Sequence, residues 1–329
     1  MWRTIIRQWF LVALALVLTL GLLLHAPLGP FSEAKWFQHA LVMGVLFVTA
    51  LPVETSALVR AIRRPWVPLL GIAMNSVAVP LMAWGVGNAL GLPTDLRHGL
   101  MVAGAVPCTL ATAAVWTRRA GGNDTAAIMV TIVTNASCFL VTPAWLRMTT
   151  NVVNVRVDFS AMIQQLGLVI VLPMLLAQLV RQRSSWGAWA TRSKAALGGF
   201  AQCGVLTMIL MGAIKCGQQL AQLHNANELP HSRQTPLSAL ALMIAGVLIV
   251  HVTCLAMGMM LARLLKFDRE DQIAVGFAGS QKTLMVGLHV SLQYFGGLTI
   301  LPMVAYHVGQ LIVDTLVADA FRRRSRPMS

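Results

Sequence analysis

The sequence has little charge, and acidic residues are its scarcest charged class. Only 11% of the 329 residues are charged, with 11 Asp and Glu against 25 Lys and Arg. A soluble domain carries about 25% charged residues, because its surface faces water on every side. So few charges cannot cover such a surface. The composition therefore excludes a water-soluble globular protein.

Long polar segments are also missing. The longest polar connection runs from Ala221 to Pro236, which is too short to bury a hydrophobic core of its own. A separate soluble domain for catalysis or nucleotide binding is therefore excluded within this sequence.

Cysteine is sparse, and its arrangement is uninformative for metal or disulfide chemistry. The five cysteines form no C-x-x-C pair and all lie in apolar stretches. The histidines of the later stretches, His251, His289 and His307, have no metal-ligand spacing to one another. We expect no metal site and no cofactor.

Apolar stretches close to the ~20 residues that cross a bilayer recur along the chain. There are ten, and the lipid bilayer is therefore the expected partner: Phe10 to Leu24, Trp36 to Leu58, Trp66 to Leu90, Leu100 to Thr117, Thr125 to Leu146, Phe159 to Val180, Ala195 to Leu220, Leu237 to Leu265, Ile273 to Tyr294 and Leu298 to Val317. This pattern predicts an all-α polytopic membrane protein with ten transmembrane helices.

The formal charge is +14, and its Lys and Arg residues are concentrated in the segments on one side of the membrane. This distribution indicates topology and not nucleic-acid binding. If the N-terminus is inside, the inner segments hold 18 Lys and Arg: Arg3, Arg7, Arg60, Arg63, Arg64, Arg118, Arg119, Arg181, Arg183, Arg192, Lys194, Arg263, Lys266, Arg269, Arg322, Arg323, Arg324 and Arg326. The outer segments hold five: Lys35, Arg97, Arg147, Arg156 and Arg233. We expect a multi-pass protein of the cell membrane with both termini in the cytoplasm.

Ten spans divide into two sets of five, so the second set enters the membrane in the opposite sense. An odd number of spans in each set is expected for two inverted repeats, which we place at residues 1–157 and 158–329. The fourth span is interrupted by Gly104 and Pro107, and the ninth by Gly276 and Gly279. Interrupted helices at matching positions of two repeats point to a binding site between them.

The ninth span contains GFAGSQKTLMVGL, Gly276 to Leu288, which differs by one residue from a phosphate-binding loop. Gln281 replaces the glycine that permits the loop's turn, and no strand pattern precedes it. A nucleotide site is therefore disfavoured. Asp314, eight residues before Arg322, is expected to form an ion pair with the arginines at the membrane interface.

Several stretches, together with the order of the spans, give the chain a family resemblance. They are MNSVAVPLMAW from Met74, VPCTLATAAVWTRRAGGND from Val106, TNASCFLVTP from Thr134, GSQKTLMVG from Gly279 and YHVGQLI from Tyr306. The chain resembles the bile acid:sodium symporter superfamily, and most closely its SBF-like branch. The resemblance implies a panel domain (spans 1, 2, 6 and 7) beside a core domain (spans 3–5 and 8–10), with spans four and nine broken where they cross.

The resemblance also implies positions for coupling ions. In sodium-coupled relatives, the ions lie behind the crossing, at positions that match Asn75, Thr112, Thr131, Phe277 and Gln281 here. Sodium needs oxygen ligands, and Phe277 stands where those relatives have a carboxylate. The neighbouring residue, Lys282, brings a positive charge instead.

Lys282 needs hydrogen-bond acceptors, because a lysine at the bilayer centre costs about 2.5–3.5 kcal/mol. Backbone carbonyls freed at Gly276 and Gly279 could supply them, as could Asn75, Thr131 and Asn135. Burial disfavours the charged form of a lysine, so Lys282 either exchanges a proton or serves as a fixed counter-charge. His289 lies two helical turns on, as a proton relay or as a packing residue.

These observations favour a secondary active transporter that moves a small organic solute, with an anion preferred, by alternating access. Its coupling would be to protons, or independent of sodium. The alternatives are a sodium-coupled symporter of bile-acid-like organic anions and, from another class, an integral-membrane enzyme. The acidic residues lie mostly at span ends, which disfavours the enzyme. The candidate residues for binding solute or ion are Asn75, Thr112, Thr131, Asn135, Ser280, Gln281, Lys282, Thr283 and His289.

Overall fold

The computed structural model describes residues 9–54, 65–110, 112–150, 158–225 and 236–324, and within these ranges the chain is helical with no strand. Six helical runs are long and apolar enough to cross a membrane: Trp66–Ala89, Asp124–Thr149, Phe159–Arg181, Lys194–Gln222, Leu237–Leu264 and Ile300–Arg323. The protein is thus an all-helical, multi-pass membrane protein.

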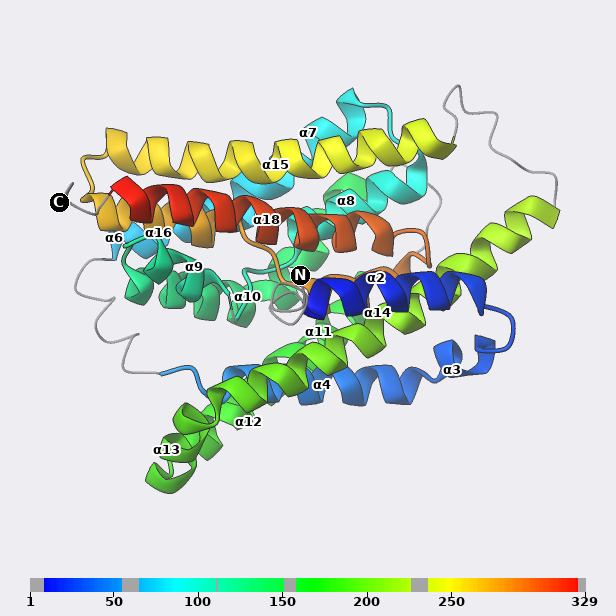
Figure 1. The fold of residues 1–329 in the computed structure, drawn as a ribbon, viewed down its shortest axis with the longest axis horizontal. Coiled ribbons are helices and arrows are strands. Elements are labelled where there is room, and N and C mark those ends of the chain that lie inside the picture. The colour runs from blue at the N-terminus through cyan, green and yellow to red at the C-terminus, as the bar shows by residue number, and fades with distance from the viewer. Residues whose placement is uncertain (1–8, 55–64, 111, 151–157, 226–235, 325–329) are drawn as a thin grey trace.

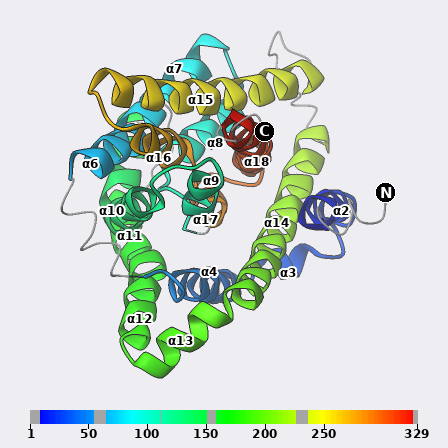
Figure 2. The same cartoon turned by 60° about the vertical axis from the view of Figure 1, so that its left-hand side comes forward.

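The helices form two groups that lie side by side (Figures 1 and 2). In the first, α14 packs along α2 and α4, and α12 packs against α4. We call it the α14 group: α2 (Trp9–Leu23), α3 (Gly29–Glu33), α4 (Lys35–Ala50), α11 (Phe159–Leu166), the π-helix η2 (Gly167–Val171), α12 (Leu172–Arg181), α13 (Ser184–Arg192) and α14 (Lys194–Asn225).

In the second group, α15 packs along α7, α16 and α18, and α10 packs against α9 and α16. We call it the α15 group: α6 (Trp66–Ala73), the π-helix η1 (Met74–Ala78), α7 (Val79–Ala89), α8 (Thr94–Ala105), α9 (Ala113–Arg119), α10 (Asp124–Thr150), α15 (Pro236–Leu264), α16 (Arg269–Ser280), α17 (Leu284–Tyr294) and α18 (Ile300–Arg324).

Two of the predicted spans are broken inside the α15 group, as their sequences suggested. The first break separates α8 from α9. It begins at Val106, whose ψ of 159° is extended, because the ring of Pro107 disfavours helical geometry in the residue before it. The second break separates α16 from α17, where Gln281 is extended with ψ 143°. The helix pairs therefore end in irregular backbone deep within the group.

A third irregularity lies between α6 and α7, which form one continuous helical run through η1. Here the N–H of Val79 bonds to Met74 O, five residues back, in place of the usual partner Asn75 O. Pro80 follows and has no N–H to offer. The carbonyl of Asn75 is therefore left without a helical donor.

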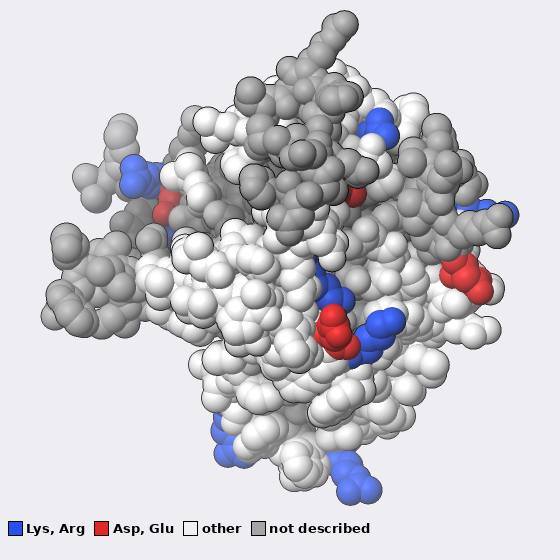
Figure 3. All heavy atoms as spheres, turned by 90° about the vertical axis from the view of Figure 1, so that its right-hand side faces the viewer, with Lys and Arg blue, Asp and Glu red and all other residues white. Residues whose placement is uncertain are grey.

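The two groups are joined differently at their two ends. We call the end where α4 begins the Lys35 end; it lies on the right in Figure 1 and faces the viewer in Figure 3, where few charged side chains are visible. All three described hydrogen bonds between the groups lie there. They run from Tyr294 OH to Gln165 Oε1 (2.5 Å), from Gln219 Nε2 to Asp95 Oδ2 (3.0 Å) and from Leu298 N to Gln219 Oε1 (3.1 Å).

Towards the opposite end, which we call the Ala50 end, a cavity of about 220 Å³ opens between the groups. Its lining comes from α4, η2 and α12 of one group and from α10 and the α8–α9 break of the other: Ala50, Val53, Leu110, Ile132, Ala136, Val171, Met174, Leu175 and Gln178. The groups are therefore closed together at the Lys35 end and hollowed between them near the Ala50 end.

Candidate functional site

Lys282 lies in the break between α16 and α17 and is completely buried. Its Nζ donates to Asn75 O (2.6 Å), to Asn75 Oδ1 (3.1 Å) and to Val106 O (2.8 Å). An ammonium group has three N–H donors, and here each has an acceptor. The positive charge is thus held by three oxygens that carry no formal charge.

Both backbone acceptors lack a helical donor because of a proline further along the chain. Asn75 O has no helical donor, since Val79 N bonds elsewhere and Pro80 has no N–H. Val106 O becomes free where α8 ends before Pro107. Irregular backbone at three places therefore converges on one side chain.

Asn75 also binds the second break directly. Its Nδ2 donates to Ala278 O (3.1 Å) and to Gln281 O (2.9 Å), while its Oδ1 accepts from Lys282. One amide thus satisfies carbonyls that the end of α16 leaves without helical partners. The wide turn of η1 and the end of α16 are locked together.

The two breaks are bonded to each other and to α18. Thr283 N donates to Pro107 O (2.9 Å) across the breaks. The side chain of Gln310 pairs with both backbone groups of Lys282, accepting from its N (2.9 Å) and donating to its O (3.0 Å). The extended backbone at Lys282 is therefore fully hydrogen-bonded, although it lies outside any helix.

The side chain of Gln281 points away from Lys282, towards α9 and α18. Its Oε1 accepts from Thr112 Oγ1 (3.0 Å) and its Nε2 donates to Asp314 Oδ2 (2.5 Å). Gln281 therefore connects the two broken helices to a buried carboxylate.

Asp314 is not at the membrane interface, so the ion pair expected from its spacing to Arg322 is wrong. Its side chain is completely buried, and its Oδ1 lies 3.0 Å from His251 Nε2. The carboxylate of α18 that reaches an interfacial arginine is Asp319, which accepts from Arg119. A count of residues to the end of the span could not distinguish the two carboxylates.

One face of α18 forms hydrogen bonds to the second break. The sequence analysis did not identify this face. Tyr306 OH donates to Ser280 O (2.9 Å), Gln310 pairs with the backbone of Lys282, and Asp314 accepts from Gln281. These three residues are four apart and lie on one face of the helix. Their spacing of four residues, which places three hydrogen-bonding side chains on one helix face, was the signal that could have found them.

Thr131 and Asn135 were expected among the acceptors of Lys282 but support the other break. Asn135 Nδ2 donates to Cys108 O (2.7 Å), and Thr131 Oγ1 donates to Ala127 O (2.9 Å) and lies 3.5 Å from Cys108 Sγ. The carbonyls of Gly276 and Gly279 are not among the hydrogen-bond acceptors of the ammonium either. Gly276 O accepts instead from Ser280 Oγ at 2.8 Å. Freed backbone carbonyls do hold the ammonium, as expected, but they belong to Asn75 and Val106.

His289 lies apart from this cluster, where α17 meets the α14 group. Its ring contacts that of His39, with centroids 5.4 Å apart. His39 Nε2 lies 2.7 Å from Gln165 Nε2. His289 is 1% exposed, and neither of its ring nitrogens has a hydrogen-bond partner among the described residues.

The positions that match sodium ligands do not offer a set of free oxygens. Both oxygens of Asn75 accept from Lys282, and Gln281 Oε1 accepts from Thr112. Phe277 is buried in an apolar cluster with Leu255 and Ile273. The oxygens around the breaks are therefore already used as hydrogen-bond acceptors, chiefly by the ammonium group of Lys282.

Comparison with known proteins identifies the family of the chain. The family model described as the SBF-like CPA transporter family (DUF4137) matches residues 8–323. The chain is 26% identical over 330 residues to the probable sodium/metabolite cotransporter BASS4 of Arabidopsis thaliana chloroplasts, covering 96% of this chain and 73% of the relative. It is 25% identical over 333 residues to sodium/bile acid cotransporter 7 of Xenopus tropicalis, covering 96% and 92% respectively. The chain therefore belongs to the SBF-like CPA transporter family.

Proposed function

We propose that this protein is a secondary transporter that moves a small organic anion across the cell membrane by alternating access. The α14 group corresponds to the panel domain and the α15 group to the core domain. The ten spans form two inverted repeats, residues 1–157 and 158–329, whose boundary falls next to residues outside the described ranges. Both termini face the cytoplasm.

The observation that carries the proposal is the buried ammonium of Lys282 where two broken helices meet. Broken helices at matching positions are where secondary transporters bind solutes and ions. Lys282 is held by neutral oxygens, so its positive charge remains uncompensated by any hydrogen-bonded carboxylate. A negatively charged solute near the crossing is therefore favoured over a cation or a neutral molecule.

The contrast between the two ends of the group interface supports alternating access. Hydrogen bonds join the groups at the Lys35 end, and the cavity between them lies near the Ala50 end. If the Ala50 end is cytoplasmic, as the arginine distribution suggests, this is a conformation open towards the cell interior. Breaking the three hydrogen bonds at the Lys35 end would open the space between the groups towards the outside of the cell.

Coupling is proposed to be independent of sodium. Lys282 brings a resident positive charge to the crossing, and Phe277 places an apolar side chain where sodium-coupled relatives have a carboxylate. The fixed ammonium thus takes the place of a coupling cation, or exchanges a proton. The names of the relatives favour the alternative of a sodium-coupled organic anion symporter.

Solute counterflow in proteoliposomes tests the transporter class. Vesicles that contain the purified protein and an unlabelled organic anion should accumulate the same labelled anion, chemically unchanged, when a panel of candidate anions is screened. Chemical conversion of the substrate without counterflow would instead indicate an integral-membrane enzyme. Relatives of this chain are transporters, which makes accumulation the expected result.

The same vesicles test the coupling. Net uptake should persist when choline replaces sodium on both sides of the membrane. A strict, saturable requirement for sodium would overturn the sodium-independent form of the proposal and leave the transporter class intact.

A further inference from the structure

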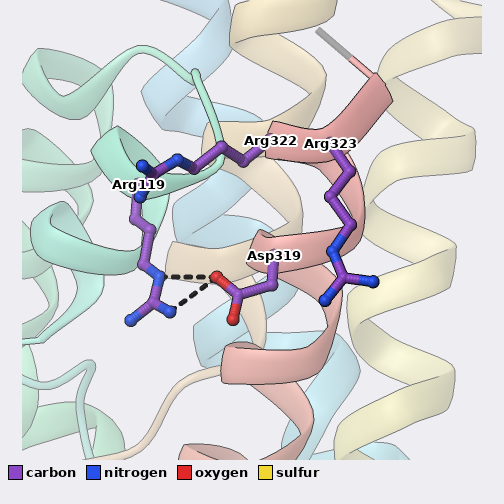
Figure 4. Close-up of a pocket in the computed structure, with 4 residues that line it drawn as sticks. All are labelled: Arg119, Asp319, Arg322 and Arg323. Atoms are coloured by element: carbon purple, nitrogen blue, oxygen red, sulfur yellow. Dashed lines mark hydrogen bonds and ion pairs between the residues drawn. The ribbon is translucent and has the colours of Figure 1, made fainter. Parts of the chain in front are cut away.

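Three arginines converge on a pocket at the end of the molecule that contains the C-terminus of α18 (Figure 4). The pocket has a volume of about 250 Å³ and lies between α9 and α18. Arg119 comes from α9, whereas Asp319 and, one turn later, Arg322 and Arg323 come from α18. The convergence therefore results from the packing of α9 against α18.

The pocket carries an excess of positive charge. The only carboxylate among its described lining residues, Asp319, is engaged by Arg119, whose Nε and Nη2 both donate to Oδ1 at 2.9 and 2.6 Å. Arg322 and Arg323 have no hydrogen bond or ion pair to any described residue. Two guanidinium groups, each with five N–H donors, thus line a pocket in which no described residue is a partner for either.

A second pocket lies on the other side of the same turn of α18. It has a volume of about 310 Å³ and combines two more arginines with apolar side chains: Met259, Met260, Arg263, Arg269, Gln272, Ile273 and Phe321. Arg269 lies over the ring of Phe321, 5.9 Å from its centroid. The end of α18 is therefore flanked by basic pockets on both sides.

The surface that continues from the second pocket along α15 is apolar. Met260 is 57% exposed and Leu264 is 69% exposed. In a membrane protein, exposed side chains of this kind face acyl chains, and arginines next to them lie at the depth of the lipid headgroups. A soluble anion would need only the arginines, whereas a lipid would use both features.

We propose that the two pockets together bind one anionic phospholipid across the end of α18, with its phosphate between Arg119, Arg322 and Arg323 and its acyl chains passing the second pocket and following the exposed face of α15. Guanidinium groups bind phosphate oxygens through paired N–H donors. Basic pockets between transmembrane helices on the cytoplasmic side are the kind of site that such headgroups occupy. This site is separate from the crossing at Lys282 and does not depend on the proposed transport function.

Lipid binding to the full-length protein in a neutral detergent tests the proposal. Phosphatidylglycerol should raise the thermal unfolding midpoint and form a bound complex in native mass spectrometry, whereas phosphatidylcholine should do neither. Arg322→Gln with Arg323→Gln should weaken phosphatidylglycerol binding roughly 30-fold, because two arginines near an anionic headgroup are removed. Asp319→Asn should strengthen binding, since it frees the donors of Arg119.

Arg183→Gln with Arg192→Gln is the matched control, because it removes the same charge from exposed positions in α13 and its approach. It should leave binding almost unchanged. An equal loss in this control would show that net charge alone attracts the lipid and would overturn the site. Inorganic phosphate at millimolar concentration is the second probe, and stabilisation by phosphate equal to that by the lipid would assign the pocket to a soluble anion and overturn the lipid proposal.

Discussion

At the scale of single residues, the ammonium of Lys282 is unusual for the neutrality of its partners. Its hydrogen bonds go to two backbone carbonyls and one amide oxygen. Each bond to a charged group is stronger than one between neutral groups, so the lysine is well held. Its charge nevertheless remains available to act on a solute at a distance of several ångströms.

We therefore expect Lys282→Met to abolish net uptake while the protein still folds. The change leaves three acceptors unpaired, at about 1–3 kcal/mol each when fully buried, so a lower unfolding midpoint with intact helical circular dichroism is expected. Lys282→Arg should fold and transport poorly, because a planar guanidinium cannot match acceptors arranged around a point-like ammonium. Uptake by Lys282→Met at the wild-type rate would remove this residue from the mechanism.

His289 leads to a prediction of the opposite sign for stability. A buried imidazole without partners is destabilising by about 1–3 kcal/mol, and its neighbours across the interface include His39. His289→Leu should therefore raise the unfolding midpoint by a few degrees or leave it unchanged. Thermal unfolding in detergent provides the measurement. A midpoint lower by several degrees would mean that the ring nitrogens have partners that stabilise the fold.

At the scale of secondary-structure elements, the wide turn at η1 gives the carbonyl of Asn75 to Lys282. Pro80→Ala restores an N–H that can bond to Asn75 O in competition with the ammonium. We expect reduced uptake by Pro80→Ala with an unchanged amount of folded protein. Uptake assays and size-exclusion profiles of the purified variant give the two readouts.

Pro173→Ala is the matched control for this change. Pro173 follows the π-helix η2 at the start of α12 in the other group, away from the crossing. Its replacement should leave uptake unaffected. If both proline variants lose activity equally, the effect comes from general helix geometry and not from the acceptor of Lys282.

The element scale also shows where sequence reasoning succeeds. The break before Pro107 and the interrupted ninth span were predictable, because proline and glycine act locally on the backbone. Lys282 and Gln281 stood out because polar residues are rare in apolar spans. The face of α18 was harder to find: Tyr306, Gln310 and Asp314 become a unit only when α18 is packed against the break, and packing depends on contacts distant in the sequence.

At the scale of the whole molecule, the arrangement of arginines predicts which end faces the cytoplasm. Cysteine-specific labelling with a membrane-impermeant reagent tests it in a background that carries Cys203→Ser, because Cys203 is exposed. Glu33→Cys at the Lys35 end should react from outside intact cells, whereas Ser185→Cys, in α13, should react only after permeabilisation. Both positions are exposed. The reverse pattern would invert the assigned topology.

The acceptors of Lys282 also constrain how the protein is made. Asn75 and Val106 precede their donor by 207 and 176 residues, so during synthesis their freed carbonyls remain in the membrane without the ammonium until α16 and α17 are inserted. A chain that stops before α16 cannot complete this cluster, and unsatisfied polar groups in a bilayer are costly. Chains truncated before α16 are therefore expected to be degraded faster than the full-length protein.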